Sequence, residues 1–362
     1  MHRSIPARFV GGAAAVLVGV GSAAPEASAK AASTGLVARP AQVTPVNAVT
    51  ITPTNYKGWA DSFRLSNGTV EVVVVPAIAR IMRYGYIGGP NQLWENPIPA
   101  GQPAKPGDWP NFGGDKAWPW PQDEWPQRIG RDWPPPAGAD QVPYLLEQIG
   151  GGAVRITSPL VIGFGLRIVR DITLSPTGTR VRIETRLVKV RTSVSPPLAA
   201  WAVMQIPAPG IVYARLLPQT SPVAGWKPLG SSGDSFAAVT VENGLLRAVR
   251  AADRSAKIGL DADLLAVVLG DTLLTVRQEG VSAETPGYAA GERAQIYSSP
   301  DSANDAKRGI APYVELELTS PRKALQKPGD SVSLVTLWEL QTLPSGAARE
   351  PALTGILATP RP

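Results

Sequence analysis

Residues 165–190 read GLRIVRDITLSPTGTRVRIETRLVKV, and this stretch decides the fold class. In its second half Val181, Ile183 and Leu187 alternate with charged residues, which is the period of two expected of a strand buried on one face. The first half, 165–174, alternates in the same way, and Ser-Pro-Thr-Gly at 175–178 supplies turn residues between the halves. The stretch therefore predicts two antiparallel strands joined by a turn.

Short strands separated by turns are predicted along most of the chain. Asn67-Gly68 is a strong two-residue hairpin signal between 62–65 and 69–75, and the valine run at 72–75 indicates a strand covered on both faces. Further strands are predicted at 78–87, 153–158, 198–206, 236–241, 245–250, 257–260, 264–269, 272–278, 293–297, 313–319 and 331–341. No amphipathic helix longer than two turns is predicted. This pattern indicates an all-β fold, a large antiparallel sandwich or barrel spanning 51–345.

The N-terminus has the pattern of a cleaved export signal. Residues 1–29 combine a basic start, an apolar centre at 9–20 and the small residues Ala-Ser-Ala at 27–29. The apolar part is too short for an ordinary membrane-spanning helix, although a retained N-terminal anchor is the alternative. We therefore expect an exported protein, periplasmic or extracellular, with a flexible lead at 30–50, a C-terminal tail at 346–362 and no stable membrane insertion after cleavage.

Composition excludes several kinds of chemistry. The chain contains no cysteine, and its only histidine, His2, lies in the expected signal. Histidine acid–base catalysis, Ser–His–Asp activation and Cys/His zinc sites are therefore excluded from the mature chain, and we expect neither a metal nor a cofactor. The net charge of +6 is spread through the strands as Arg-x-Arg, so nucleic-acid binding is not expected.

Residues 91–140 depart from the strand pattern. Six of the ten tryptophans lie there, among carboxylates, amides, a lysine and many prolines. Because proline removes a backbone donor and fixes φ, neither a helix nor a central strand is predicted to propagate through this Trp/Pro-rich loop. Aromatic rings beside polar groups are typical of carbohydrate binding, since rings stack on C–H groups and polar groups bond hydroxyls. The alternative is a lid that only closes one end of the core.

The candidate ligand-binding residues come from this loop and from one strand. Within 112–122, Asp115 and Lys116 offer an acceptor and a donor on divergent side chains, or else form a surface ion pair. Trp118 and Trp120 share one face if the backbone is extended. Trp201, Val203 and Gln205 share a face of the strand at 198–206, where core packing of Trp201 is the alternative. The candidates are Trp94, Asp115, Lys116, Trp118, Gln122, Trp125, Trp201 and Gln205.

The candidate catalytic residue lies near the C-terminus. In the strand at 313–319, Glu315 and Glu317 lie on the face opposite Val314 and Leu316. If this face lines a cleft, Glu315 is the candidate general base. A pair of solvent-facing glutamates is the commoner outcome for such a pattern.

Four segments of the chain resemble the galactose mutarotase-like (aldose 1-epimerase-like) superfamily, and most resemble its uncharacterised bacterial branch with a DUF4380-type domain. The resemblance covers roughly residues 60–340. It rests on SNGTVEVVVVPAIARIMRYGYIGGPNQLWENP (66–97), NFGGDKAWPWPQDEWP (111–126), LAAWAVMQIPAPG (198–210) and YVELELTSPRKALQKPGDSVSLVTLWEL (313–340).

This resemblance implies a β-supersandwich with an open concave face that binds carbohydrate. Active mutarotases of the family use a histidine acid and a glutamate base. In this chain the segment Trp201–Gln205 stands where the family has its histidine, and Glu315 is the candidate for the glutamate. Ordinary mutarotation is therefore in doubt, whereas sugar binding is compatible with the residues present.

Three hypotheses about function follow. The first is an exported carbohydrate-binding protein whose partner is a carbohydrate ligand. The second is a noncanonical sugar epimerase or lyase that uses Glu315 as base, with Lys116 or Tyr313 as proton donor or charge stabiliser. The third is a non-enzymatic envelope interaction module, which an exposed and flat Trp/Pro-rich loop would favour.

Overall fold

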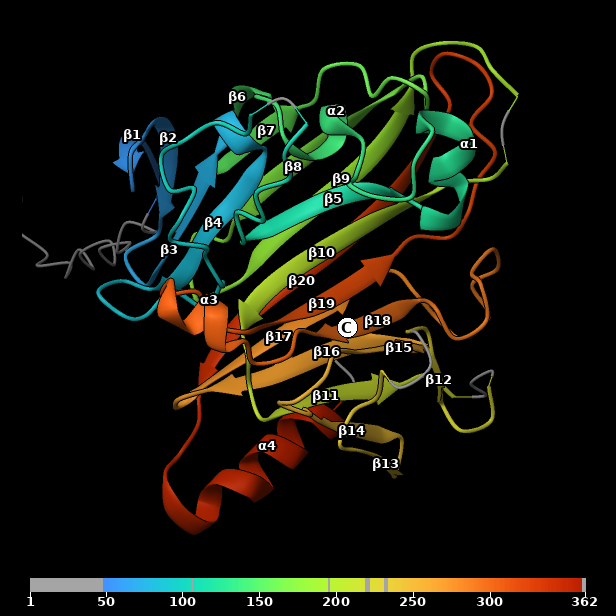
Figure 1. The fold of residues 1–362 in the computed structure, drawn as a ribbon. Helices are drawn as coiled ribbons and strands as arrows, with labels where there is room; N and C mark the ends of the chain where they lie inside the picture. The colour runs from blue at the N-terminus through green and yellow to red at the C-terminus, as the bar shows by residue number, and fades with distance from the viewer. Residues whose placement is uncertain (1–47, 106, 195, 219–221, 231–233, 360–362) are drawn as a thin grey trace, which may run out of the picture. The chain divides into compact units, whose positions relative to one another are not determined.

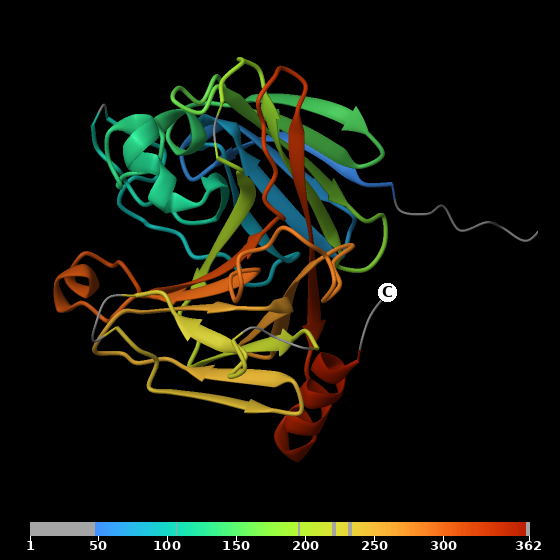
Figure 2. The ribbon, with the colours of Figure 1, turned by 90° about the vertical axis from the view of Figure 1, so that its right-hand side faces the viewer.

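The computed structural model describes residues 48–105, 107–194, 196–218, 222–230 and 234–359. The expected signal at 1–29, and the expected lead up to residue 47, lie outside the described residues. Twenty antiparallel strands form two ten-stranded sheets (Figures 1 and 2). The predicted all-β fold, a large antiparallel β-supersandwich, is confirmed.

In the first sheet the strand order is β1 (Thr50–Tyr56), β2 (Trp59–Ser66), β3 (Val70–Val75), β4 (Arg80–Tyr86), β5 (Asp115–Trp120), β10 (Ala199–Pro207), β19 (Tyr313–Thr319), β18 (Ala294–Ser298), β15 (Ala256–Leu260) and β12 (Trp226–Pro228). In the second sheet it is β13 (Ala238–Glu242), β14 (Leu245–Val249), β11 (Ile211–Leu216), β16 (Ala262–Leu269), β17 (Thr272–Gln278), β20 (Ser331–Thr342), β9 (Val181–Lys189), β8 (Leu166–Leu174), β7 (Ala153–Thr157) and β6 (Leu145–Gly150).

Helices are short and few in the described residues. They are α1 (Trp125–Ile129), α2 (Ala137–Asp140), α3 (Ala303–Lys307) and α4 (Arg349–Ala358), with single 3-10 turns η1 (Pro76–Ile78), η2 (Gln122–Glu124) and η3 (Gly346–Ala348). The ten residues of α4 make nearly three turns, and the sequence patterns did not predict this helix because its apolar residues follow no strong amphipathic period. Leu353 and Leu357 of α4 are buried against the second sheet. None of these helices combines the length and apolar character needed to cross a membrane.

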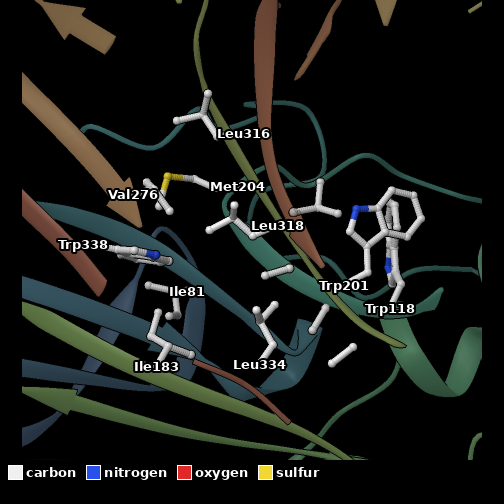
Figure 3. Close-up of a cluster of buried hydrophobic side chains, with 14 of the residues drawn as sticks. Ile81, Trp118, Ile183, Trp201, Met204, Val276, Leu316, Leu318, Leu334 and Trp338 are labelled. Atoms are coloured by element: carbon white, nitrogen blue, oxygen red, sulfur yellow. The ribbon is translucent and has the colours of Figure 1, made fainter. Parts of the chain in front are cut away.

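The main core lies between the two sheets. Strand β9 buries every second side chain, and β8 shows the same alternation, as residues 165–190 predict. The Asn67-Gly68 hairpin joins β2 and β3, and the side chain of Asn67 accepts hydrogen bonds from two turn N–H groups. Figure 3 shows Met204 of β10 lying toward Val276 and Trp338 of the second sheet, whereas Trp201 of the same strand lies beside Trp118. Trp201, Val203 and Gln205, which occupy the alternate positions of β10, therefore face away from the second sheet.

Strand β5 shows that the expectation of no central strand within residues 91–140 is wrong. Its six residues are all buried and pair with β10 along their length, although Pro119 lies among them. On its other side β5 pairs with β4 at one position only, Asp115 with Ile81. Beyond that position no strand of the described residues pairs with this side of β5, so the missing N–H of Pro119 breaks no ladder there. The helix α1 also forms within this loop, because Pro126 lies in its first turn, where a free N–H is not needed.

A buried ion pair fixes the loop to the sheet. Arg80 at the start of β4 donates to Asp140 at 2.8 Å, and both side chains are completely buried. The indole N–H groups of Trp109 and Trp118 donate to the same carboxylate at 2.8 and 2.9 Å. One hydrogen bond from β4 and two from the loop thus replace the water that Asp140 loses on burial.

We expect Asp140→Ala to destabilise the fold by about 3–5 kcal/mol, because it leaves Arg80 buried without a counter-charge. Urea unfolding followed by tryptophan fluorescence measures the change. Asp123→Ala is the matched control, because Asp123 is exposed on η2 and its loss should cost little. Equal effects of the two variants would contradict the assigned role of Asp140.

Candidate functional site

Five of the candidates lie on the outer face of the first sheet, defined as the face turned away from the second sheet: Lys116, Trp118, Trp201, Gln205 and Glu315. Strand register places them together, because directly paired residues share a face. Lys116 and Trp118 of β5 pair with Val203 and Trp201 of β10, and Gln205 of β10 pairs with Glu315 of β19. Glu315 in turn pairs with Tyr297 of β18, which pairs with Lys257 of β15. Five strands thus contribute to one surface.

Glu315 lies at the centre of this surface. Its carboxylate accepts a hydrogen bond from Gln205 Nε2 at 2.9 Å and lies 3.2 Å from the ammonium of Lys116. The side chain of Glu315 is 13% exposed, whereas that of Lys116 is 1% exposed. Lys116 and Gln205 therefore hold the carboxylate from beneath and leave its outer edge accessible.

Glu317 is likewise held by a lysine and a second donor, but its side chain is buried more deeply than that of Glu315. One oxygen, Oε2, accepts from Trp201 Nε1 at 2.9 Å and from Lys257 at 3.1 Å. The other oxygen, Oε1, is buried and has no hydrogen-bond partner among the described residues. The paired-glutamate face predicted for β19 is present, but Glu317 is completely buried rather than solvent-facing.

Aromatic rings surround the two glutamates. Trp118 and Trp201 meet edge to face with ring centroids 5.2 Å apart, and each carries a lysine ammonium over its ring, Lys116 at 5.1 Å and Lys257 at 5.0 Å. Trp94 packs against Tyr313 at 4.6 Å. The cation–π contact lowers the cost of burying the Lys116 ammonium, and it helps to position the partly exposed ammonium of Lys257.

Burial shifts the pKa values of the site residues in different directions. It lowers the pKa of Lys116 below its ordinary value, against the opposing effect of Glu315. It raises the pKa of Glu317 above its ordinary value, although Lys257 acts in the other direction. Burial also raises the pKa of Tyr297 to about 12 and that of Tyr313 still further, with Glu315 adding to both shifts. Both tyrosines are therefore protonated at neutral pH and can donate hydrogen bonds.

Asp115 is the one carboxylate among the candidates that does not reach this face. It precedes Lys116 on β5 and points the other way, into the space between the sheets, where it is fully buried and paired with Arg170 of β8. The structure therefore brings Lys116 and Glu315 together and places Asp115 apart from them.

Two of the other candidates from the loop, Trp94 and Trp125, are buried beside the site, whereas Gln122 is partly exposed and lies apart from it. Trp94 is buried and donates through its indole N–H to the carbonyl of Ala311, and Trp125 is buried with its N–H on the carbonyl of Pro119. Gln122 lies on η2, away from this hydrogen-bond network, and donates to the carbonyl of Asp132. Trp94 and Trp125 still border the cluster through ring contacts with Tyr313 and Trp201.

The paired glycines at 113–114 serve the backbone. Both have positive φ, and a side chain on either would collide with a carbonyl oxygen, that of Trp94 at 2.2 Å or that of Ile81 at 2.3 Å. This close approach lets Trp94 donate its N–H to the carbonyl of Gln205 at 2.8 Å. The segment that carries Trp94 is thereby fixed across the outer face.

Sequence reasoning missed Lys257 and Tyr297, and it also missed Gln295, which pairs with Glu317 across β18 and β19. Alternation could have shown that Gln295 and Tyr297 share a face. It could not have shown that this face joins that of Glu315, because strand neighbours far apart in sequence are not visible in a single chain. Among the described residues no group of three or more acidic or histidine side chains could hold a metal ion.

A separate cavity lies on the opposite side of the molecule, between α4 and the strands β11, β14 and β16. Its volume is about 710 Å³. Its lining contains leucines and the Arg215–Asp263 ion pair, but none of the residues on the outer face of the first sheet. Size alone would favour this cavity, whereas the convergent charged and aromatic groups lie on the first sheet.

No protein-family profile matches the chain, and no curated protein matches it. Solved structures do. A proposed mutarotase from Salmonella typhimurium matches with a TM-score of 0.50 and 12% identity, over 83% of this chain and 95% of its own. The chain has the galactose mutarotase-like fold.

Two further structures with lower scores are similar. A proposed aldose 1-epimerase from Escherichia coli K12 has a TM-score of 0.47 and 10% identity, over 82% of this chain and 100% of its own. A galactose mutarotase related enzyme from Lactobacillus acidophilus has a TM-score of 0.44 and 10% identity, over 78% and 97%. At these identities the likeness concerns the fold and assigns no activity.

We expect the ionisation of Glu317 to make the folded protein less stable as pH rises. Because its pKa is raised on folding, the folded chain keeps a proton that the unfolded chain loses above about pH 4.5, so the free energy of unfolding falls from there up to the raised pKa. Glu317→Gln removes this contribution. Urea unfolding between about pH 4 and pH 8 should show the variant gaining stability relative to the wild type as pH rises. Glu350→Gln, at an exposed glutamate of α4, is the control. Parallel curves for wild type and Glu317→Gln would contradict the prediction.

Proposed function

We propose that this chain binds a carbohydrate on the outer face of β5, β10, β19, β18 and β15. The observation that carries this proposal is the hydrogen-bonded group of Lys116, Gln205 and Glu315 beside aromatic rings. Sugars need such a combination, because their hydroxyls take paired hydrogen bonds and their C–H faces pack on rings. The fold, shared with a proposed mutarotase, supports the same class of ligand.

The residues at the accessible edge are expected to contact the sugar. Glu315, Tyr297, Tyr313 and Lys257 are partly exposed, whereas Lys116, Gln205 and Trp201 are buried beneath them. The partly exposed side chains supply an acceptor, two hydroxyl donors and an ammonium. The buried side chains hold these groups in place, which reduces the entropy lost on binding.

We expect Tyr297→Ala to weaken sugar binding by about tenfold, because the ring and its hydroxyl are both lost. Tyr297→Phe is the matched control, since it keeps the ring and should lose only several-fold. Isothermal titration calorimetry with a panel of mono- and oligosaccharides, together with tryptophan fluorescence, measures both. If the wild-type protein responds to no sugar in the panel, the proposal is wrong.

A second candidate function is a sugar epimerase or lyase that uses Glu315 as base. Its support is the neighbouring pair of carboxyls, because the different burial of Glu315 and Glu317 separates an accessible carboxylate from a buried acid. Catalysis then requires that Glu315 take a proton from the bound sugar. Lys116 or Tyr313 would donate a proton or stabilise the negative charge that develops on the sugar.

If this second function holds, Glu315→Gln should abolish turnover and leave sugar binding within several-fold. Exchange between anomers or epimers, followed by proton NMR, measures turnover, and calorimetry on the same variant measures binding. Unchanged turnover in Glu315→Gln would remove Glu315 from the reaction without affecting the proposal of sugar binding.

The third hypothesis, a non-enzymatic envelope module, has less support. It is favoured by a flat and exposed Trp/Pro-rich loop, but Trp94, Trp118, Trp120 and Trp125 are all buried. Among the six tryptophans of this loop, all of which lie in the described residues, Trp133 is the one that is exposed, at 42%. We propose export on the sequence of residues 1–29 alone, and N-terminal sequencing of protein recovered outside the cytoplasm would test it.

A further inference from the structure

A second polar cavity lies on the same outer face of the first sheet, over β1 to β4. Its volume is about 480 Å³, within the range of roughly 300–1,000 Å³ typical of small-molecule sites. Arg64 of β2 and Arg83 of β4 both pair with Val73 of β3, so their side chains leave the sheet on the same face. The charged residues that line the cavity are Lys57, Arg64, Glu71, Arg83 and Glu95.

Glu71 holds the two arginines by one nitrogen each. Arg64 Nε donates to one carboxylate oxygen, and Arg83 Nε donates to the other at 2.6 Å. Burial alone would raise the pKa of Glu71, but the hydrogen bonds and charges of the two arginines lower it below its ordinary value, so Glu71 stays ionised. Arg83 Nη2 donates to the carbonyl of Gly89 at 2.9 Å. Both Nη groups of Arg64, and Nη1 of Arg83, bond to no atom of the described chain.

Lys57 and Tyr56 complete the cavity from β1 and its turn. Tyr56 donates its hydroxyl to Glu95 at 2.9 Å, and Lys57 bonds the other oxygen at 2.7 Å. The side chain of Lys57 is 53% exposed. The lining of the cavity thus carries three cations and two carboxylates, which leaves one net positive charge. The nitrogens of Arg64 and Arg83 that bind neither Glu71 nor Gly89 are the donors that remain for a ligand.

We propose that this cavity binds an anionic group, a carboxylate, sulfate or phosphate, through Arg64, Arg83 and Lys57. Guanidinium groups suit such ligands because their planar donors match the oxygens of these anions. The anion is carried by an acidic carbohydrate or is a free inorganic ion. This inference stands apart from the proposed function, because the cavity uses neither Glu315 nor Lys116.

The test is calorimetric titration of the whole protein with sodium sulfate, sodium phosphate, glucuronate and glucose. We expect at least one of the three anions to bind, and any binding of glucose to be the same in the wild type and in Arg64→Gln, because glucose carries no charge. Arg64→Gln should weaken anion binding about tenfold or more, because a charged hydrogen-bond donor is lost. Lys57→Gln, at a more exposed residue, should weaken it several-fold. Glu95→Gln, which removes a negative charge, should strengthen it.

Two controls separate this site from other effects. Arg167→Gln removes an exposed arginine from the second sheet and should leave anion binding unchanged. Glu315→Gln should leave the binding of sulfate and phosphate unchanged, so the anion site can hold or fail independently of the sugar site. Tighter binding of glucuronate than of sulfate supports the acidic carbohydrate, and the reverse supports the free ion. The proposal is overturned if no anion binds, if Arg64→Gln and Lys57→Gln bind like wild type, or if Arg167→Gln weakens binding equally.

Discussion

The outer face of the first sheet depends on one buried carboxylate, that of Asp140. A carboxylate with no access to water costs several kcal/mol unless donors replace the solvent. Here Arg80 and the indoles of Trp109 and Trp118 supply those donors from three parts of the chain. Satisfying Asp140 therefore brings the end of the Trp/Pro-rich loop, its middle and the start of β4 to one point. Because Trp118 belongs to β5, the same contact fixes the strand that carries Lys116.

The two glutamates of β19 are then held by matching sets of groups. Each has a lysine and a second donor, Gln205 for Glu315 and Trp201 for Glu317, and each lysine also lies over a tryptophan ring. Such support restricts the rotamers of the carboxyls before any ligand arrives. The two glutamates differ in burial. Glu315 is partly accessible, whereas Glu317 is completely buried and burial raises its pKa. The two glutamates therefore differ in exposure although they lie two residues apart on one strand.

Sequence patterns correctly predicted the parts of this structure that depend on local geometry. The alternation in 165–190 and the shared face of Glu315 and Glu317 follow from the period of a strand, and the Asn67-Gly68 turn follows from the preference of these two residues for tight hairpin turns. All three are present. The same rule shows that Asp115 and Lys116 diverge. It does not say which of them faces the core, because that depends on Arg170, whose side chain meets Asp115 across the two sheets. The strand β5 was missed for a similar reason, since proline is tolerated there only because β4 pairs with β5 at a single position.

The segment that carries Trp94 and Glu95 links the two polar regions of the outer face. Its backbone is fixed by hydrogen bonds to Gln205 and Gly114 and by the bridge between Glu95 and Gly113. Trp94 packs on Tyr313 at the edge of the glutamate pair, whereas Glu95 bonds Tyr56 and Lys57 in the second cavity. Neighbouring side chains thus serve different regions while sharing one rigid backbone. Gly113 makes this possible, because a side chain there would collide with the backbone of Trp94 and Glu95 and push the segment off the sheet, which would disturb both regions together.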